Sequence, residues 1–199
     1  MKNSVRGWFV SGMLPASAGA SALILAAALS FSAPVHAQQP APAATPTATP
    51  APVEKEKDEL GKYTTADGDP IYNIQADGTL DWYTYSGYRR YHAECHVCHG
   101  PDGMGSSYAP ALANSLKTMT YPQFMEIVVN GKQNIGVGTA DQVMPAFGEN
   151  KNVMCYLDDI YIYLKARADG ALGRERPSKR EDKTKAYTAN ENQCFGRPS

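Results

Sequence analysis

The densest group of reactive side chains in the sequence is Cys95-His96-Val97-Cys98-His99. A C-x-x-C-H run is typical of c-type haem attachment, because two thiols at this spacing can each form a thioether with one vinyl group of a single haem. His99 follows directly and would lie under the iron as its proximal ligand. Thioredoxin-like and zinc sites also use C-x-x-C, but no second C-x-x-C is present to complete a four-cysteine zinc site. The run therefore predicts one covalent haem c on Cys95, Cys98 and His99.

The second axial ligand of the iron is expected well downstream, and Met144 is the best candidate. Pro145 follows it, and proline disfavours a helical conformation for the preceding residue. We therefore expect Met144 in an extended loop that reaches across the haem, giving His/Met ligation, which raises the reduction potential relative to His/His. A bis-histidine haem is the less usual alternative, and His92 and His96 are interpreted as solvent-facing or pocket-flanking. The methionines that we interpret as filling gaps in a core are Met104, Met119, Met125 and Met154.

Three helices are expected to position these ligands. The first runs from about Tyr83 to Cys95 and ends at the haem-attachment turn. The second covers Tyr121–Asn130, where apolar residues recur at helical spacing and Thr120-Tyr121-Pro122 supplies a cap with proline in the first turn. The third runs from about Asn152 to Ala168, with an apolar stripe on one face and cations near its end.

Gly87 lies inside the first expected helix and weakens it, because glycine costs helix stability. That cost indicates a packing reason, namely the close approach of another helix. Tyr91 lies four residues further on, on the same face. We expect Ile160 and Tyr163 of the third helix to meet Gly87 and Tyr91.

Two loops are expected to complete the haem pocket. The stretch Gly100–Leu112 is too rich in glycine and proline for regular structure and should wrap the proximal side of the haem. In it, the carbonyl of Pro110, or a neighbouring one, could accept a hydrogen bond from Nδ1 of His99 and fix the ring, while Leu112 would pack on the haem edge. The second loop, Gly131–Val143, is rich in glycine and leads to Met144.

The N-terminal part is interpreted as export and linker sequence. Residues 1–37 have a basic start, an apolar run of about a dozen residues and a small-residue cleavage site after Ala37, as in a secretory signal peptide. An uncleaved anchor is the alternative, but the apolar run is short of the ~20 residues that span a bilayer. Residues 38–62 are predicted to be a Pro/Ala-rich and charged linker, whose run Glu54–Glu59 is a solvated lead-in or a short exposed helix.

Extensions flank the expected haem domain, residues 82–170, on both sides. Residues 63–81 contain turn signals, and Asp77-Gly78 is a hairpin candidate. Residues 171–199 carry seven Lys or Arg against four acids and little apolar content, which is typical of disorder. A Cys155–Cys194 disulfide would tie this extension back in an oxidising compartment; the alternative is two free cysteines. The whole chain has a net charge of −1, so it lacks the excess of basic residues that would indicate nucleic-acid binding.

The order of helices, haem motif and methionine loop resembles a class I cytochrome c over residues 82–168. The resemblance implies an all-α fold, here with N- and C-terminal extensions. The stretches Tyr91–Ser106, Met144–Gly148 and Leu157–Tyr161, with the extra cysteine pair, are similar to the methanol-metabolism c-type cytochromes, which relate to cytochrome c-L. The resemblance is specific at Gly87, Tyr91, Cys95, Cys98, His99, Pro110, Leu112, Met144 and Tyr163.

This resemblance implies a periplasmic one-electron carrier rather than an enzyme. The implied electron donor is a methanol dehydrogenase that carries pyrroloquinoline quinone, of the lanthanide-dependent type, and the implied acceptor is another cytochrome c or an oxidase. No stable membrane insertion is expected after signal cleavage. One alternative is an electron carrier for a different periplasmic dehydrogenase, which oxidises sugars, sulfite or ethanol. A second is a haem peroxidase or ligand sensor, which needs an open sixth site on the iron.

Overall fold

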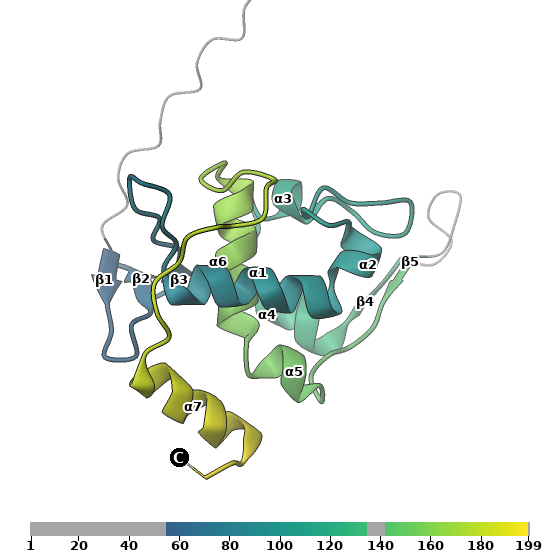
Figure 1. The fold of residues 1–199 in the computed structure, drawn as a ribbon. Helices are drawn as coiled ribbons and strands as arrows, with labels where there is room; N and C mark the ends of the chain where they lie inside the picture. The colour runs from purple at the N-terminus through teal and green to yellow at the C-terminus, as the bar shows by residue number, and fades with distance from the viewer. Residues whose placement is uncertain (1–54, 135–141, 199) are drawn as a thin grey trace, which may run out of the picture. The chain divides into compact units, whose positions relative to one another are not determined.

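The computed structural model describes residues 55–134 and 142–198 (Figure 1). The predicted signal peptide, residues 1–37, and the linker up to residue 54 lie outside the described residues. The helices are α1 (Trp82–Glu94), α2 (His96–His99), α3 (Leu112–Ser115), α4 (Tyr121–Asn130), α5 (Lys151–Met154), α6 (Leu157–Ala168) and α7 (Lys185–Phe195). The strands are β1 (Lys55–Lys57), β2 (Tyr63–Thr65), β3 (Pro70–Ile71), β4 (Lys132–Asn134) and β5 (Gln142–Met144). The fold is mainly α-helical, as expected, but it also contains two small sheets that the all-α expectation did not include.

The crossing of α1 and α6 is the central contact of the fold (Figure 1). A Cβ on Gly87 would lie 1.8 Å from the backbone oxygen of Asp159 and 2.8 Å from Cβ of Tyr163. Only glycine allows the two helices to come this close. The predicted close approach at Gly87 and its contact with Tyr163 are confirmed. The other residue closest to Gly87 is Asp159 rather than the predicted Ile160.

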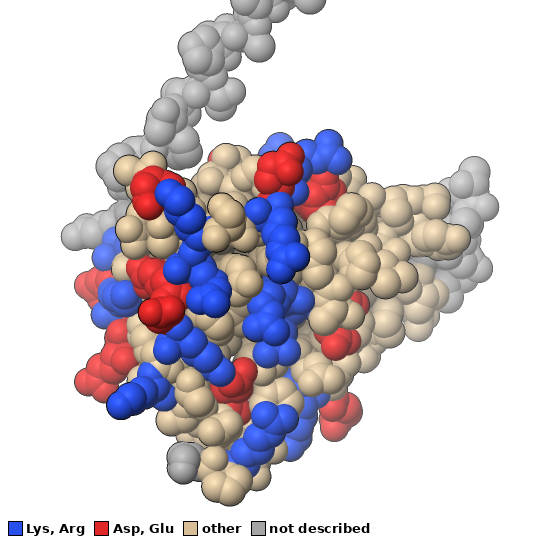
Figure 2. Space-filling view, in the orientation of Figure 1, with Lys and Arg blue, Asp and Glu red and all other residues tan. Residues whose placement is uncertain are grey.

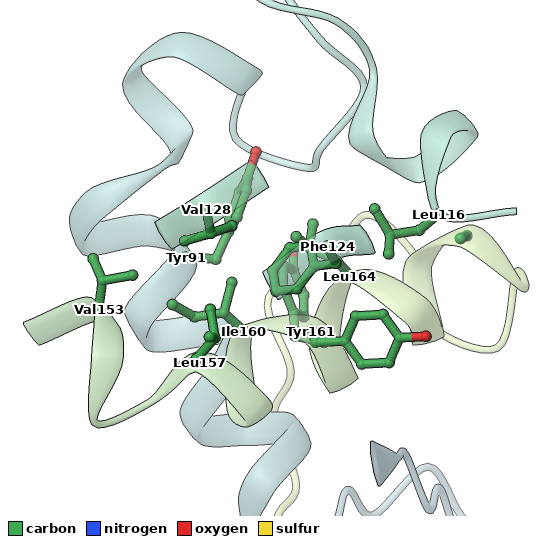
Figure 3. Packing of buried hydrophobic residues seen from close by; sticks show 11 residues of the cluster. Tyr91, Leu116, Phe124, Val128, Val153, Leu157, Ile160, Tyr161 and Leu164 are labelled. Carbon is green, nitrogen blue, oxygen red and sulfur yellow. The ribbon is translucent and has the colours of Figure 1, made fainter. Parts of the chain in front are cut away.

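The hydrophobic core forms where α6 meets α1, α4 and α5. Figure 3 shows Ile160 and Leu164 of α6 close to Tyr91 of α1 and Phe124 of α4. All four are buried, and Tyr91 has no exposed surface. Burial of one such apolar side chain contributes roughly 1.5–3 kcal/mol, so this cluster sets the relative positions of the helices that carry the haem motif.

Helix α4 forms where the sequence predicted it, at Tyr121–Asn130. The Thr120 side chain accepts a hydrogen bond from the Gln123 N–H, and the Gln123 side chain accepts one from the Thr120 N–H. This reciprocal capping box satisfies two backbone donors that a helix start otherwise leaves without partners.

The single helix expected over Asn152–Ala168 is wrong, because the chain breaks between α5 and α6. Tyr156 has φ −133° and ψ 21°, outside the helical region. The break turns the Tyr156 hydroxyl toward Glu191 of α7, at 2.6 Å, and its ring toward the Arg90 guanidinium, at 3.5 Å. Contacts between distant parts of the chain therefore outweigh local helix propensity at this position.

The chain before α1, which includes the end of the predicted linker, is more regular than the sequence suggested. The charged run that we expected to be a solvated lead-in or a short helix contains β1, which pairs antiparallel with β2, and β2 pairs with β3. The hairpin expected at Asp77-Gly78 is confirmed as a tight turn with one bridge, Ile74 to Leu80.

The C-terminal extension runs from α6 back over α1 to α7 (Figure 1). Its backbone pairs with Leu80, which donates to the Lys179 carbonyl at 3.2 Å and accepts from the Glu181 N–H at 2.8 Å. The predicted disulfide is confirmed, with Cα atoms of Cys155 and Cys194 5.8 Å apart. Composition alone is typical of disorder here, but with the tail tied back Lys185–Phe195 forms α7.

Within residues 55–134 and 142–198, we find no helix with the length and hydropathy needed to cross a bilayer.

Candidate haem-binding site

The predicted attachment cysteines lie on the turn that joins α1 to α2. Cys95 ends α1, donating its N–H to the Tyr91 carbonyl at 2.8 Å, and the N–H groups of Cys98 and His99 point back to the Cys95 carbonyl at 3.2 and 3.1 Å. Among the described cysteines, these two are free thiols, because Cys155 and Cys194 form the disulfide. The short helix therefore presents two thiols and one imidazole within a single turn.

Burial affects the first thiol strongly. Removal of Cys95 from water raises the pKa of its thiol to about 12, and the nearby negative charge of Glu94 acts in the same direction. Its side chain packs against the core cluster. Cys98 is exposed. The two thiols thus lie at the border between the core and solvent, as attachment to one edge of a flat macrocycle requires.

His99 is buried, with 6% of its surface exposed. Its Nδ1 lies 3.0 Å from the Pro110 carbonyl oxygen, which confirms the contact expected from the sequence. Because a carbonyl only accepts, Nδ1 carries the proton and donates, and Nε2 is left as the nitrogen with a lone pair for a metal. The contact fixes both the tautomer and the direction of the ring.

The loop between α2 and α3 is held in place from several sides. The Tyr91 hydroxyl donates to the Gly100 carbonyl, and the Gly105 N–H donates to the His99 carbonyl at 2.9 Å. Arg167 of α6 donates through Nε to the Asp102 carbonyl at 3.1 Å. As predicted, this segment is irregular, but α1 and α6 fix its course and hence the position of Pro110.

Met144 ends β5 and is extended, as expected from the proline that follows it. The predicted loop from Gly131 to Val143 is wrong in its described parts. Lys132–Asn134 and Gln142–Met144 pair as antiparallel strands, with Lys132 opposite Met144. Residues 135–141 lie outside the described residues. A Cβ on Gly131, where φ is 74°, would lie 2.6 Å from the Met144 carbonyl oxygen. Close backbone contact therefore holds the methionine segment against the end of α4.

Met144 and Leu112 are half-buried and pack against the same core cluster as Cys95. A thioether sulfur, an imidazole nitrogen and two thiols are the donors that a c-type haem uses. Cys95, Leu112 and Met144 therefore border the same hydrophobic cluster, and the donor types that the sequence singled out fit haem c.

Sequence reasoning missed a buried carboxyl at the crossing of α1 and α6. Asp159 is 3% exposed and accepts a hydrogen bond from the Tyr187 hydroxyl at 2.5 Å, which lies 2.9 Å from the Ser86 hydroxyl. Burial raises the pKa of Asp159 to about 7, against the opposing effect of these hydroxyls. Asp158-Asp159 reads as an ordinary acidic first turn of a helix, so no local signal marks it as buried.

Comparisons with known proteins identify c-type cytochromes among the relatives of this chain. Residues 84–164 match the family model for cytochrome C oxidase, cbb3-type, subunit III. Cytochrome c-553I of Paracoccus denitrificans is 58% identical over 137 residues, covering 69% of this chain and 60% of that protein. Cytochrome c-555 of Methylococcus capsulatus (strain Bath) is 39% identical over 94 residues, 47% of this chain and 69% of that protein.

A solved structure extends the likeness to three dimensions. The crystal structure of the c-type cytochrome XoxG from Methylobacterium extorquens AM1 matches with a TM-score of 0.65 and 58% identity, over 70% of this chain and 85% of that one. The chain thus spans 60% of the length of the Paracoccus relative but most of the XoxG structure. The chain belongs to the c-type cytochromes with the class I fold, binds haem c covalently, and is an electron-transfer protein rather than an enzyme.

Proposed function

We propose that Cys95 and Cys98 form the two thioethers to the haem and that His99 and Met144 are the axial ligands of its iron. The free thiols on one turn support the first assignment. The Nδ1 contact to Pro110 supports the second, because it leaves Nε2 available. Leu112 and Pro110 would line the pocket. When bound, the haem supplies a one-electron change at iron.

A stable sixth ligand favours electron transfer over peroxidase or sensor chemistry, since both of those need an open or displaceable site. Met144 lies in a paired strand whose backbone is in close contact with Gly131. Such a segment loses little further freedom when its side chain binds a metal. The fixed position of the Met144 segment is the observation on which the proposed function rests. It supports a closed iron site that exchanges electrons through the haem edge.

We infer that the donor is a pyrroloquinoline-quinone methanol dehydrogenase of the lanthanide-dependent type, and that electrons then pass to another cytochrome c or an oxidase. The resemblance of Tyr91–Ser106 and Met144–Gly148 to methanol-metabolism cytochromes supports this donor, as does the similarity to the named cytochromes. The proposed compartment is the periplasm, reached with the signal peptide of residues 1–37. A disulfide between Cys155 and Cys194 suits an oxidising compartment.

The test is a stopped-flow assay of the oxidised holoprotein with purified methanol dehydrogenase and methanol. We expect the haem to be reduced at micromolar partner. If this enzyme does not reduce the haem but a sugar, sulfite or ethanol dehydrogenase reduces it rapidly, the proposed donor is wrong and the proposed role as an electron carrier stands. Reaction of the oxidised iron with added cyanide as fast as in a peroxidase would instead support the open-site alternative.

A further inference from the structure

A row of cationic side chains crosses the face of the molecule shown in Figure 2. We name it the basic stripe and define it as Arg89 of α1 with Arg174, Arg176, Lys179 and Arg180 of the C-terminal extension. Arg174, Arg176, Lys179 and Arg180 are all exposed, as is Arg89. The electron-carrier function described above does not use these residues, although the sequence already marks the extension as basic.

The stripe is built into the fold rather than carried on a loose tail. The pairing of Leu80 with residues 179–181 fixes the backbone of the extension. Arg180 lies over the rings of Trp82 and Tyr85, with its guanidinium carbon 5.3 and 4.9 Å from their centroids. Because Arg89 is four residues beyond Tyr85 on α1, it shares that face. Because the backbone that carries the stripe is already fixed, it loses little conformational entropy when a partner binds.

The charges of the stripe are only partly neutralised by acids of the same chain. Lys179 contacts Asp77 at 3.3 Å and Arg180 lies 3.9 Å from Asp182; both pairs are exposed, and such pairs are weak in water. Within residues 55–134 and 142–198, no carboxylate forms an ion pair with Arg89 or Arg176. Arg89 and Arg176 are therefore the stripe cations that no ion pair among the described residues neutralises.

A shallow groove lies under the stripe. Its lining includes Tyr85, Arg176, Lys179 and Arg180, and no carboxylate is among its lining residues. Three cations beside an aromatic ring suit the carboxylates of a protein segment, which they can contact from several sides.

One end of the stripe reaches the haem-binding loop. Arg174 forms an ion pair with the buried carboxylate of Asp102, which follows His99 by three positions. The same loop and α2 expose apolar side chains: Val97 and Tyr108 are each 75% exposed. Over α2 and this loop, the face in Figure 2 is nearly free of charged residues. An apolar patch with a charged border is the arrangement of a protein interface.

We propose that the basic stripe is the charged border of the docking site for the electron donor, and that the donor presents a surface rich in Asp and Glu opposite it. The identity of the donor rests on the proposed function; the chemistry of the contact does not. Charge attraction along one side of the apolar patch would raise the association rate and orient the haem-side patch toward the donor.

The test compares the wild-type holoprotein with Arg89→Gln/Arg176→Gln, since these two side chains make no ion pair whose loss would disturb the fold. The control is Lys117→Gln/Lys151→Gln, which removes the same charge from exposed residues outside the stripe. Stopped-flow reduction by methanol dehydrogenase is followed from low (~0.01 M) to high (~1 M) ionic strength, where screening lengths fall from about 30 to 3 Å.

We expect the stripe variant to react roughly 3- to 10-fold more slowly at low ionic strength and to match the wild type at high ionic strength. The control should stay close to the wild type throughout. A stripe variant with wild-type rates and salt dependence, or an equal loss in the control, would overturn the proposal.

A second measurement separates this proposal from the choice of donor. If methanol dehydrogenase does not reduce the wild type, the proposed donor is wrong. The stripe is then tested by NMR titration of the reduced holoprotein with a synthetic oligo-glutamate peptide. Shifts confined to the stripe and its groove, absent in the stripe variant, support an acidic protein partner. Equal shifts with inorganic phosphate at the same charge concentration, or no shifts at all, overturn it.

Discussion

Replacement of Asp159 by Asn should change how stability depends on pH. Asp159 lies on α6, is almost fully buried, and accepts a hydrogen bond from the Tyr187 hydroxyl of α7. That hydroxyl also contacts Ser86 of α1, so one carboxyl joins three helices. An Asn side chain has a similar shape and still offers an oxygen to Tyr187, but it never carries a charge.

The size of the effect follows from the pKa of this carboxyl. Burial raises the pKa of Asp159 from 3.8 to about 7 in the folded protein. Between these values the folded state holds a proton that the unfolded state has released, so stability falls as pH rises through this window and is level above it. At about 1.4 kcal/mol per unit, the loss amounts to about 4 kcal/mol as an upper bound. Asp159→Asn removes this loss.

Urea unfolding of the holoprotein, followed by far-UV circular dichroism from about pH 4.5 to about pH 8, measures the effect. Wild type and Asp159→Asn should have similar free energies of unfolding at the acidic end, and the variant should become the more stable by several kcal/mol at the alkaline end. Asp182→Asn, which alters an exposed carboxyl, is the control and should follow the wild type. Parallel curves for wild type and Asp159→Asn would refute the reasoning.

Three further changes test the packing of the fold. Gly87→Ala should destabilise the protein by at least 1–3 kcal/mol, since its Cβ would lie 1.8 Å from a backbone oxygen of α6; Gly173→Ala, with open space around it, should be near neutral in thermal unfolding. Cys155→Ser with Cys194→Ser should cost about 4 kcal/mol for a 39-residue separation, and an unchanged urea midpoint would contradict this. Tyr187→Phe should cost about 1–2 kcal/mol; equal stability would show that its hydroxyl contributes nothing.

Much of the haem region could be predicted from the sequence because its signals are local. The C-x-x-C-H run needs five consecutive residues, and Thr120 with Gln123 marks the start of α4 within one turn. The glycine at position 87 predicted a close helix contact because its cost in a helix needs a compensating reason. These features depend on neighbours in sequence, which is why they could be recognised without a structure.

Other parts depend on contacts between distant residues. Strand β1 is a charged run that pairs along its length with Tyr63–Thr65, and its own residues give no local signal for an extended conformation. The break at Tyr156 follows from contacts with Arg90 and Glu191, which no local pattern reveals. In the sequence, Asp159 resembles any acidic residue in the first turn of a helix. Its burial arises only from the packing of α1, α6 and α7.

Helix α7 depends on both local signals and distant contacts. Thr184 accepts a hydrogen bond from the Tyr187 N–H at the start of the helix, and Gly196 ends it with φ 68° in the left-handed region. Both are recognisable boundary signals, but the segment between them has a weak apolar face. Its position is held by the Cys155–Cys194 disulfide and by the buried ring of Tyr187, which are tertiary constraints.

The absorption spectrum of the oxidised holoprotein tests the central claim, that His99 and Met144 hold the iron of a haem attached to Cys95 and Cys98. A sulfur ligand on ferric iron gives a weak far-red charge-transfer band. We predict this band in the wild type and in Met119→Ala, and its loss in Met144→Ala. A wild type without the band, or a Met144→Ala variant that keeps it, would contradict the account.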